Sequence, residues 1–279
     1  MRTVAPLRVI VPVHDGWHVL EACLASLVRT IHPPHRIELV DDASPDPRVR
    51  PLLASFAARD CGRFDLVTQD RNLGFVATVN AAMARTRDDV VLLNSDTIVT
   101  AGWLERLVAC RDSDPTIATA TPFSNNAEIC ALPHFCAPNP VPAEPDAFAR
   151  ACQAVGPPTY AELPTGVGFC LLIRRAALDA IGDFDLATFG RGYGEENDFC
   201  RRAAGHGWRN VICDDAYVAH VGNVSFGALG LGPGGGNAAR LSARYPDYNR
   251  IVAEFIAADP LRARREAILA RLGRAPGDP

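Results

Sequence analysis

The sequence has no long uninterrupted apolar run. Its first candidate, LRVIVPV at residues 7–13, meets Pro12, His14 and Asp15 too soon for a signal peptide or a membrane span. No later stretch reaches the roughly 20 apolar residues that a helix needs to cross a bilayer. We therefore expect no leader and no membrane span, and any membrane contact would be peripheral.

Paired cysteine motifs are also missing. The nine cysteines are odd in number and scattered, with no C-x-x-C pair of the zinc or redox kind. Reduced, mostly buried thiols are the expected form, and they favour a cytoplasmic location.

The sequence lacks a strong excess of either charge. Its 28 basic and 32 acidic side chains give a net charge of −4, which argues against a broad basic face and so against a nucleic-acid partner. With 48% apolar and 22% charged residues, the composition is that of a globular protein with a sizeable core. At 279 residues, we expect one domain with a tail and a small-molecule partner; the oligomeric state is left open.

What the sequence does have is an alternation of strands and helices. Apolar, β-branched runs at residues 8–13, 36–42, 64–69 and 88–96 predict strands, and helical spacing of apolar residues follows at 17–30, 49–60, 75–87 and 103–112. This order predicts an α/β fold with a mostly parallel central sheet flanked by helices.

The regular alternation of predicted strands and helices ends after Pro122. Residues 131–164 carry many prolines and little periodicity, which predicts a long surface excursion that forms part of an acceptor site. The sheet resumes at 166–175, a helix follows at 176–182, another begins near Glu195, and a strand covers 208–220. We expect 227–236 to be a flexible glycine-rich segment, 237–270 to hold one or two helices, and 274–279 to be a frayed end.

Polar residues gather where the predicted strands end. In open α/β sheets, ligands bind at the carboxyl ends of the strands. Asp41 and Asp42 could accept hydrogen bonds there from a base N–H or ribose hydroxyls, and the alternative is turn chemistry in DDASPD. Asn72 and Gly74, in RNLGF, have the same two interpretations.

Two residues are candidate metal ligands. Asp96 closes NSD at the end of an aliphatic strand, where a carboxylate could hold Mg²⁺ or Mn²⁺, although a turn or helix-capping aspartate would look the same. His220 ends another strand, where it is either a metal ligand or a structural histidine.

Three carboxylates lie at the start of a predicted helix, in GYGEENDFCRR. The helix dipole alone would favour Glu195, Glu196 and Asp198 there. The glycines around Tyr193 make a mobile approach that a simple cap would not require, so we also consider a carboxylate that removes the proton from an attacking hydroxyl.

Together these segments resemble the family 2 inverting glycosyltransferases of GT-A fold, in their rhamnosyltransferase-like branch. The resemblance covers about residues 8–226, and it rests on VIVPVHDG (9–16), ELVDDASPD (38–46), NLGFVATVN (72–80), VVLLNSDTIVTAGWL (90–104), TGVGFCLLIRRAAL (165–178), GYGEENDFCRRA (192–203) and HVGNVSF (220–226). It implies a glycosyltransferase domain at 1–226, with a nucleotide-binding half at about 1–120 and an acceptor half at about 121–226, and a tail at 227–279.

The resemblance also implies roles for individual residues. Glu196 would be the general base, with Glu195 as the fallback, and Asp96 and His220 would hold Mn²⁺ or Mg²⁺. The nucleotide-sugar donor would be bound by Pro12, Val13, His14, Asp41, Asp42, Asn72, Gly74, Asn94, Ser95 and Asp96. The acceptor would be bordered by Gly166, Gly168, Phe169 and Tyr193.

The sequence departs from the family at its acidic D-x-D metal motif, because Asn94 replaces the first carboxylate. We therefore expect a modest metal affinity. The implied donor is a UDP- or dTDP-sugar, and the implied acceptor is a glycan or lipid-linked hydroxyl in bacterial polysaccharide assembly. The basic segment 260–273 allows a peripheral membrane contact, but a solvated packing helix is the interpretation we favour.

Two other functions are alternatives for a chain with this predicted fold. A nicotinamide dehydrogenase would need G-x-G-x-x-G after the first strand, where this chain reads PVHDGW. A catalytically inactive relative that binds a nucleotide sugar or a glycan is the remaining alternative.

Overall fold

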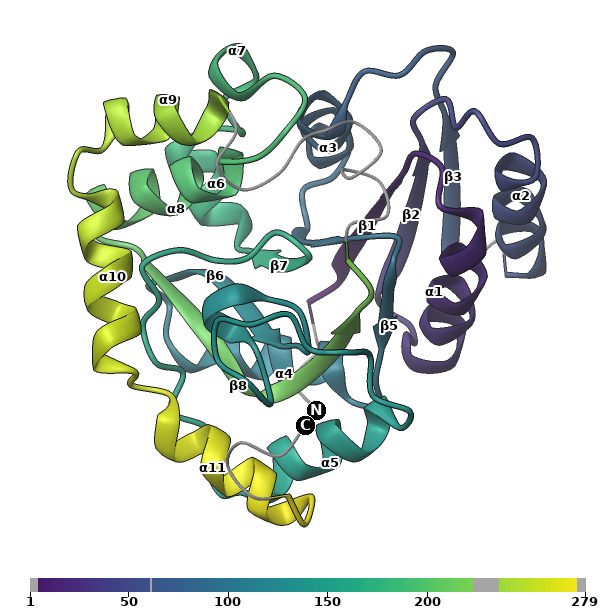
Figure 1. Ribbon diagram of the computed structural model, residues 1–279. Helices are drawn as coiled ribbons and strands as arrows, with labels where there is room; N and C mark the ends of the chain where they lie inside the picture. Colours follow the sequence, from purple (N-terminus) through teal and green to yellow (C-terminus); the bar gives the residue numbers. More distant parts are fainter. Residues whose placement is uncertain (1–4, 61, 223–235, 275–279) are drawn as a thin grey trace.

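A computed structural model describes residues 5–60, 62–222 and 236–274 of the chain (Figure 1). Over these residues the strands form one sheet in the order β3-β2-β1-β4-β7-β6-β8-β5, with helices on both of its faces. The first half contains β1 (Leu7–Val13), α1 (Trp17–Thr30), β2 (Arg36–Asp41), α2 (Val49–Arg59), β3 (Phe64–Thr68), α3 (Phe75–Ala84) and β4 (Asp89–Leu93). The strands β3, β2, β1 and β4 are parallel, so the predicted alternation is confirmed.

The second half of the sheet is mixed. This part of the chain contains β5 (Thr97–Val99), α4 (Trp103–Ser113), β6 (Ile117–Phe123), β7 (Cys170–Ile173), α6 (Arg175–Ile181), the short α7 (Leu186–Phe189), α8 (Glu195–Gly205) and β8 (Arg209–His220). Strand β7 runs antiparallel to β4 and β6, and β5 runs antiparallel to β8. Strands β5 and β6 were not predicted from the sequence. Alanine and threonine make β6 weakly apolar, yet it is buried throughout, and Thr119 satisfies its hydroxyl by donating to Asn210 Oδ1 at 2.8 Å.

The prediction of a surface excursion at residues 131–164 is wrong in part. After the 3₁₀ turn η1 (Glu128–Cys130), the chain forms α5 (Pro145–Ala154), which packs against β8. Phe148 and Cys152, one helical turn apart, are buried, and Phe148 stacks on Tyr217 of β8 with 5.1 Å between ring centroids. Proline at the first helical position and this apolar pair were the available signals for a helix.

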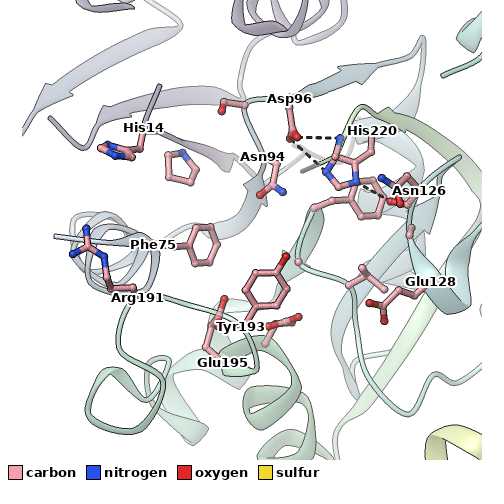
Figure 2. A pocket seen from close by; sticks show the side chains of 18 of the residues that line it. His14, Phe75, Asn94, Asp96, Asn126, Glu128, Arg191, Tyr193, Glu195 and His220 are labelled. Carbon is pink, nitrogen blue, oxygen red and sulfur yellow. Dashed lines mark hydrogen bonds and ion pairs between the residues drawn. The ribbon is translucent and has the colours of Figure 1, made fainter. Parts of the chain in front are cut away.

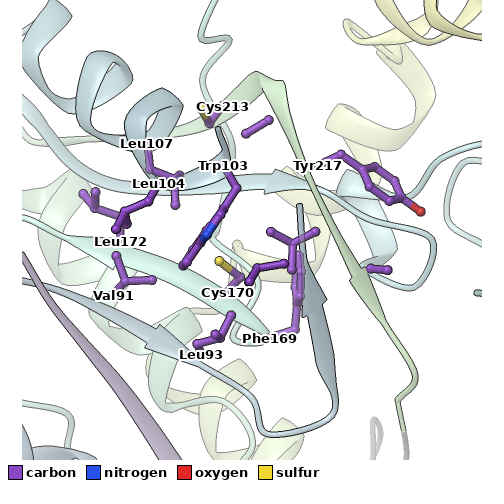
Figure 3. Close-up of a cluster of buried hydrophobic side chains, with 14 of the residues drawn as sticks. Val91, Leu93, Trp103, Leu104, Leu107, Phe169, Cys170, Leu172, Cys213 and Tyr217 are labelled. Atoms are coloured by element: carbon purple, nitrogen blue, oxygen red, sulfur yellow. The ribbon is translucent and has the colours of Figure 1, made fainter. Parts of the chain in front are cut away.

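The core lies between the sheet and the helices, and its centre is Trp103 of α4 (Figure 3). This side chain is fully buried among Val91, Leu104 and Leu172 and their neighbours, and its indole N–H donates to Thr30 Oγ1 at 3.2 Å. The eight described cysteines are free, and all except Cys136 are buried, which agrees with the predicted reduced thiols. Cys61 lies outside the described residues.

The C-terminal part contains three helices where one or two were predicted: α9 (Gly236–Arg244), α10 (Tyr248–Ala258) and α11 (Arg262–Arg271), which run along one side of the molecule (Figure 1). Helix α9 contacts α7, and α11 packs against α5. The predicted glycine-rich segment lies outside the described residues except for Gly236, and so does the predicted frayed end except for Arg274. Among the described helices, none is both long and apolar enough to cross a membrane.

Candidate active site

A cavity of about 410 Å³ opens where the parallel strands end. It gathers fifteen of the seventeen site residues singled out from the sequence: Pro12, Val13, His14, Asp42, Asn72, Gly74, Asn94, Ser95, Asp96, Gly168, Phe169, Tyr193, Glu195, Glu196 and His220. They come from the ends of β1, β2, β4 and β8, the loops after β3 and before β7, and the start of α8.

Asp41 and Gly166 do not line this cavity. The Asp41 carboxylate is buried, accepting from the backbone N–H of Ser44 at 2.9 Å and from Arg50 Nε at 3.0 Å. It therefore holds the turn after β2, as the turn interpretation of DDASPD predicted. Gly166 lies beneath the cavity wall, where an added Cβ would come within 2.5 Å of Leu171 Cδ1.

One wall of the cavity is a hydrogen-bonded chain of three side chains. The Nδ1 atom of His14 lies 3.0 Å from the Asp42 carbonyl oxygen, which can only accept, so Nδ1 carries the proton. The other ring nitrogen, Nε2, then accepts from Asn72 Nδ2 at 2.7 Å, and Asn72 Oδ1 accepts from Arg191 Nη2 at 2.7 Å. The chain links β1 to the loops that precede α3 and α8, and it fixes the His14 tautomer.

Asp42 holds the loop that carries Asn72. Its two carboxylate oxygens accept from the backbone N–H groups of Leu73 and Gly74, at 2.7 and 2.9 Å. Gly74 has φ of 85°, and an added Cβ would meet the Arg191 backbone at 3.2 Å. Glycine is therefore required where the two loops approach each other.

Asp96 and His220 face each other across the cavity wall, with 3.4 Å between Asp96 Oδ1 and His220 Nε2 (Figure 2). They come from the edge of the sheet at which Thr97 of β5 pairs with His220 of β8. The other oxygen, Asp96 Oδ2, accepts from the Gly222 backbone N–H at 3.1 Å. The His220 ring stacks on Phe169, with 5.1 Å between centroids.

The tautomer of His220 suits a metal ligand. Its Nδ1 lies 2.7 Å from the Asn126 carbonyl oxygen, so Nδ1 carries a proton and the neutral ring has its lone pair on Nε2, facing Asp96. Burial opposes charge on this ring, but the hydrogen bond and charge of Asp96 outweigh burial and raise the pKa of His220. Two ligands of one octahedral Mg²⁺ ion, each at about 2.1 Å, lie about 3 Å apart, close to the separation seen here.

The described residues contain no group of three or more His, Cys, Asp or Glu side chains placed to hold a metal. The protein would thus supply two ligands at most from these residue types, and phosphate and water oxygens would supply the rest. That is the usual manner of binding Mg²⁺ with a phosphorylated substrate. The Asn94 side chain also lines the cavity, where it offers a neutral oxygen in place of a carboxylate.

Glu195 and Glu196 begin α8 at the opposite wall. Burial and the neighbouring Glu196 raise the pKa of Glu195 well above its ordinary value, and its Oε2 atom has no hydrogen-bond partner. Glu196 is less enclosed: burial raises its pKa to about 7, and its Oε2 accepts from the Gly194 backbone N–H at 3.3 Å. A carboxylate with a pKa near 7 is suited to exchange protons at neutral pH.

Tyr193 projects into the middle of the cavity, between Phe75 and Glu128 (Figure 2). Its backbone φ of 70° is unusual for a non-glycine residue, and Gly190, Gly192 and Gly194 beside it also have positive φ. Burial, followed by the charge of Glu196, raises the pKa of the Tyr193 hydroxyl. The predicted glycine-rich approach is thus a defined loop in an uncommon conformation.

Several cavity residues were missed from the sequence: Phe75, Thr78, Asn126, Ala127, Glu128, Cys136, Ala137, Pro138, Arg191 and Gly222. Arg191 had a usable signal, because an arginine between two glycines in a loop is free to reach a ligand. Glu128 and Cys136 had none, since their backbones, with φ of 46° and 55°, lie in a segment without periodicity.

The chain is similar in sequence to proteins of two mycobacterial species. Uncharacterized proteins of Mycobacterium tuberculosis and Mycobacterium bovis are 29% identical to it over 175 residues, which is 57% of this chain and 60% of each relative. The chain thus spans about 60% of the length of the curated relatives it matches.

The fold is similar to that of solved glycosyltransferases. GalNAc-T7 with UDP, GalNAc and Mn²⁺ superposes with a TM-score of 0.61 at 15% identity, covering 78% of this chain and 43% of its own. The mannosyltransferase PcManGT of Pyrobaculum calidifontis, with GDP-Man and Mn²⁺, gives 0.57 at 17% identity over 98% and 80%. S. aureus TarS with UDP-GlcNAc gives 0.58 at 16% identity over 90% and 71%. At these identities the likeness shows the GT-A fold alone.

The sequence also matches a family. The family model described as glycosyl transferase family 2 matches residues 8–182, which include the His14, Asp42, Asn72 and Asp96 positions and end before Glu196 and His220. Because this match covers more than half of the chain, and the fold agrees with it, the chain belongs to glycosyl transferase family 2.

Proposed function

We propose that this chain is an inverting glycosyltransferase that moves a sugar from a UDP- or dTDP-sugar to a hydroxyl group of a glycan or lipid-linked acceptor, with Mn²⁺ or Mg²⁺ on the diphosphate. The observation that carries the proposal is that the Asp96–His220 pair and the Glu196 carboxylate line the same cavity. Transfer needs both a site for the diphosphate charge and a base for the acceptor.

In this proposal the donor occupies the strand-end wall. Pro12, Val13 and His14 border the nucleotide base, and Asp42 and Asn72 retain lone pairs for ribose or base N–H groups. Residues 1–120 form the nucleotide-binding half of a domain at 1–226, and 121–226 form its acceptor half. The solved neighbours with UDP, GDP-Man and UDP-GlcNAc support a nucleotide-sugar donor for this fold.

Asp96 and His220 Nε2 would hold the divalent ion. When bound, such an ion neutralises the charge that develops on a departing diphosphate. The chain's own part is to fix Asp96 through the Gly222 N–H and to fix the His220 ring through Asn126 and Phe169, so that both ligand atoms face one point.

Glu196 would accept the proton of the acceptor hydroxyl. As that O–H bond breaks, the oxygen forms a bond to the anomeric carbon, and the bond from this carbon to the diphosphate oxygen breaks with its electron pair leaving on the nucleoside diphosphate. Attack from the face opposite the leaving group inverts the configuration, by the geometric logic of inverting glycosidases. Tyr193, Gly168 and Phe169 would border the acceptor, and the ring of Tyr193 would exclude water.

Two measurements test the proposal. A thermal-shift screen with UDP-glucose, UDP-N-acetylglucosamine, dTDP-rhamnose and GDP-mannose, each with and without Mn²⁺, should show stabilisation by at least one donor that increases with Mn²⁺. Donor hydrolysis and transfer are then compared between the natural chain and Glu196→Gln, which we expect to lower kcat by about 10²- to 10⁴-fold. Donor binding without any turnover in the natural chain would instead favour an inactive nucleotide-sugar-binding relative.

A further inference from the structure

We propose that Asn237, in the C-terminal helix α9, is a positioning residue that holds the loop 189–194 and through it places Tyr193 and Glu196 in the cavity. The inference rests on the proposed function for its catalytic part and on contacts for its structural part. In this inference a C-terminal helix helps to shape the candidate active site, although the family match ends at residue 182.

The loop cannot easily hold its own shape. Gly190, Gly192, Tyr193 and Gly194 have φ of 57°, 134°, 70° and 103°, so four of five consecutive residues lie in left-handed or extended positive-φ conformations. Glycine populates such conformations freely but is not confined to them. Within the loop, one backbone hydrogen bond is present, from the Gly192 N–H to the Phe189 carbonyl at 3.1 Å. In addition to the hydrogen bond from Arg191 to Asn72, an external tie ahead of Tyr193 therefore helps to keep one conformation.

Asn237 supplies that tie. Its Nδ2 atom donates to the Phe189 carbonyl at 2.8 Å and to the Gly192 carbonyl at 2.7 Å, so it spans the loop just before Tyr193. Asn237 Oδ1 is in turn held by Arg240 Nη1 at 2.6 Å. An amide side chain has two N–H donors, and here both are directed at carbonyl oxygens of the loop.

Helix α9 is itself anchored to α8. Asp198 is fully buried in α8, three residues after Glu195, and its Oδ1 accepts from Arg244 Nη1 at 2.7 Å and from the Tyr245 hydroxyl at 2.8 Å. Arg244 also pairs with Asp185 at 2.8 Å. The helix that carries Asn237 is thus fixed to the helix that begins with the candidate base, and the loop is held at both ends.

The test compares Asn237→Ala with Asn249→Ala. Both truncate an asparagine on the C-terminal helices, but Asn249 donates only within them, to Ser242 Oγ at 3.1 Å. Asn237→Asp keeps the shape while removing the N–H donors, and we expect it to behave like Asn237→Ala. Each variant is used only if its thermal midpoint shows that it is folded.

The first readout is amide hydrogen exchange over residues 189–198, which needs no ligand. We expect faster exchange in Asn237→Ala and Asn237→Asp and no change in Asn249→Ala. Unchanged exchange in both Asn237 variants would overturn the positioning role, whether or not the natural chain turns over a donor.

The second readout is release of nucleoside diphosphate from UDP-glucose, UDP-N-acetylglucosamine, dTDP-rhamnose and GDP-mannose with Mn²⁺. We expect kcat to fall by about 10- to 100-fold in the Asn237 variants, with a smaller change in donor KM, because misplacing reacting groups by about 1 Å costs that much. Faster exchange with unchanged kcat would overturn the inference. If the natural chain releases no diphosphate, the proposed function fails and the exchange result alone decides the positioning role.

Discussion

Glu196 should give the reaction its pH dependence. With a pKa of about 7, the proposed base is half protonated near neutrality. Because only the carboxylate can accept a proton, kcat/KM should rise about tenfold per pH unit below 7 and level off above it. A pH–rate profile between pH 5.5 and 9 measures this, and a flat profile across pH 7 would remove Glu196 from the base role.

The proposed metal ligands Asp96 and His220 can be tested by measuring activity as a function of Mn²⁺ concentration. His220→Ala and Asp96→Asn should raise the Mn²⁺ concentration that gives half-maximal rate by tenfold or more, since each removes one of the two proposed ligands. Asn94→Asp restores a second carboxylate beside Asp96, and it should lower that concentration because opposite charges attract in a partly enclosed cavity. An unchanged Mn²⁺ requirement in all three variants would place the ion elsewhere.

At the scale of elements, the contact between α8 and α9 should be a major source of local stability. Asp198 is fully buried and is shared by Arg202, Arg244 and Tyr245. Asp198→Ala leaves these donors without their acceptor, and we expect a loss of roughly 3 kcal/mol in the free energy of unfolding, measured by urea denaturation. Glu254→Gln, which breaks an exposed ion pair with Arg250 in α10, is the control and should leave the midpoint unchanged.

The elements also show how far the sequence could predict the fold. Strands and helices up to β4 were predicted because β-branched runs and helical spacing alternate without interruption there. Strand β6 and helix α5 were not, because alanine, threonine and proline carry weak periodicity and their burial depends on partners far along the chain. The contact of α5 with β8, for example, joins Phe148 to Tyr217 across 69 positions.

The residues of the candidate site were likewise predictable only in part. Residues at strand ends, such as His14 and Asp96, were predicted because the carboxyl ends of parallel strands share one edge. Asp41 and Asp42 were adjacent in sequence and alike in chemistry, and only the structure separates them, since one binds Arg50 and the other lines the cavity. Glu128 was not predictable, because a positive φ in an irregular segment leaves no trace in the sequence.

At the scale of the whole molecule, Glu195 and Glu196 of α8 should make the folded chain less stable as pH rises. A carboxyl group whose pKa is raised by folding favours the folded state below its unfolded pKa, about 4.3, and this stabilisation is lost as pH rises through the folded pKa. For Glu196 that window runs from about 4.3 to about 7, and for Glu195 it extends further.

Glu195→Gln removes one of these titrations. Its thermal midpoint should exceed that of the natural chain at pH 8 and differ little at pH 4.5. The difference between the two curves isolates this residue from other titrating groups. Equal midpoints at both pH values would contradict the raised pKa of Glu195 and its burial as a neutral acid.

The pairing of β5 with β8 should constrain the lengths of these two strands in homologous chains. Thr97, the neighbour of Asp96 in the chain, lies opposite His220. The two proposed metal ligands, Asp96 and His220, are therefore held in register by the strand ladder rather than by the identity of the residues between them. A slip of one position would turn His220 to the other face of the sheet. We therefore expect homologous chains to admit no insertion or deletion at Ile98 and Ala219, whereas the residue types there change as far as the buried position of Ala219 allows. Spacing, more than residue identity, then preserves the site in evolution.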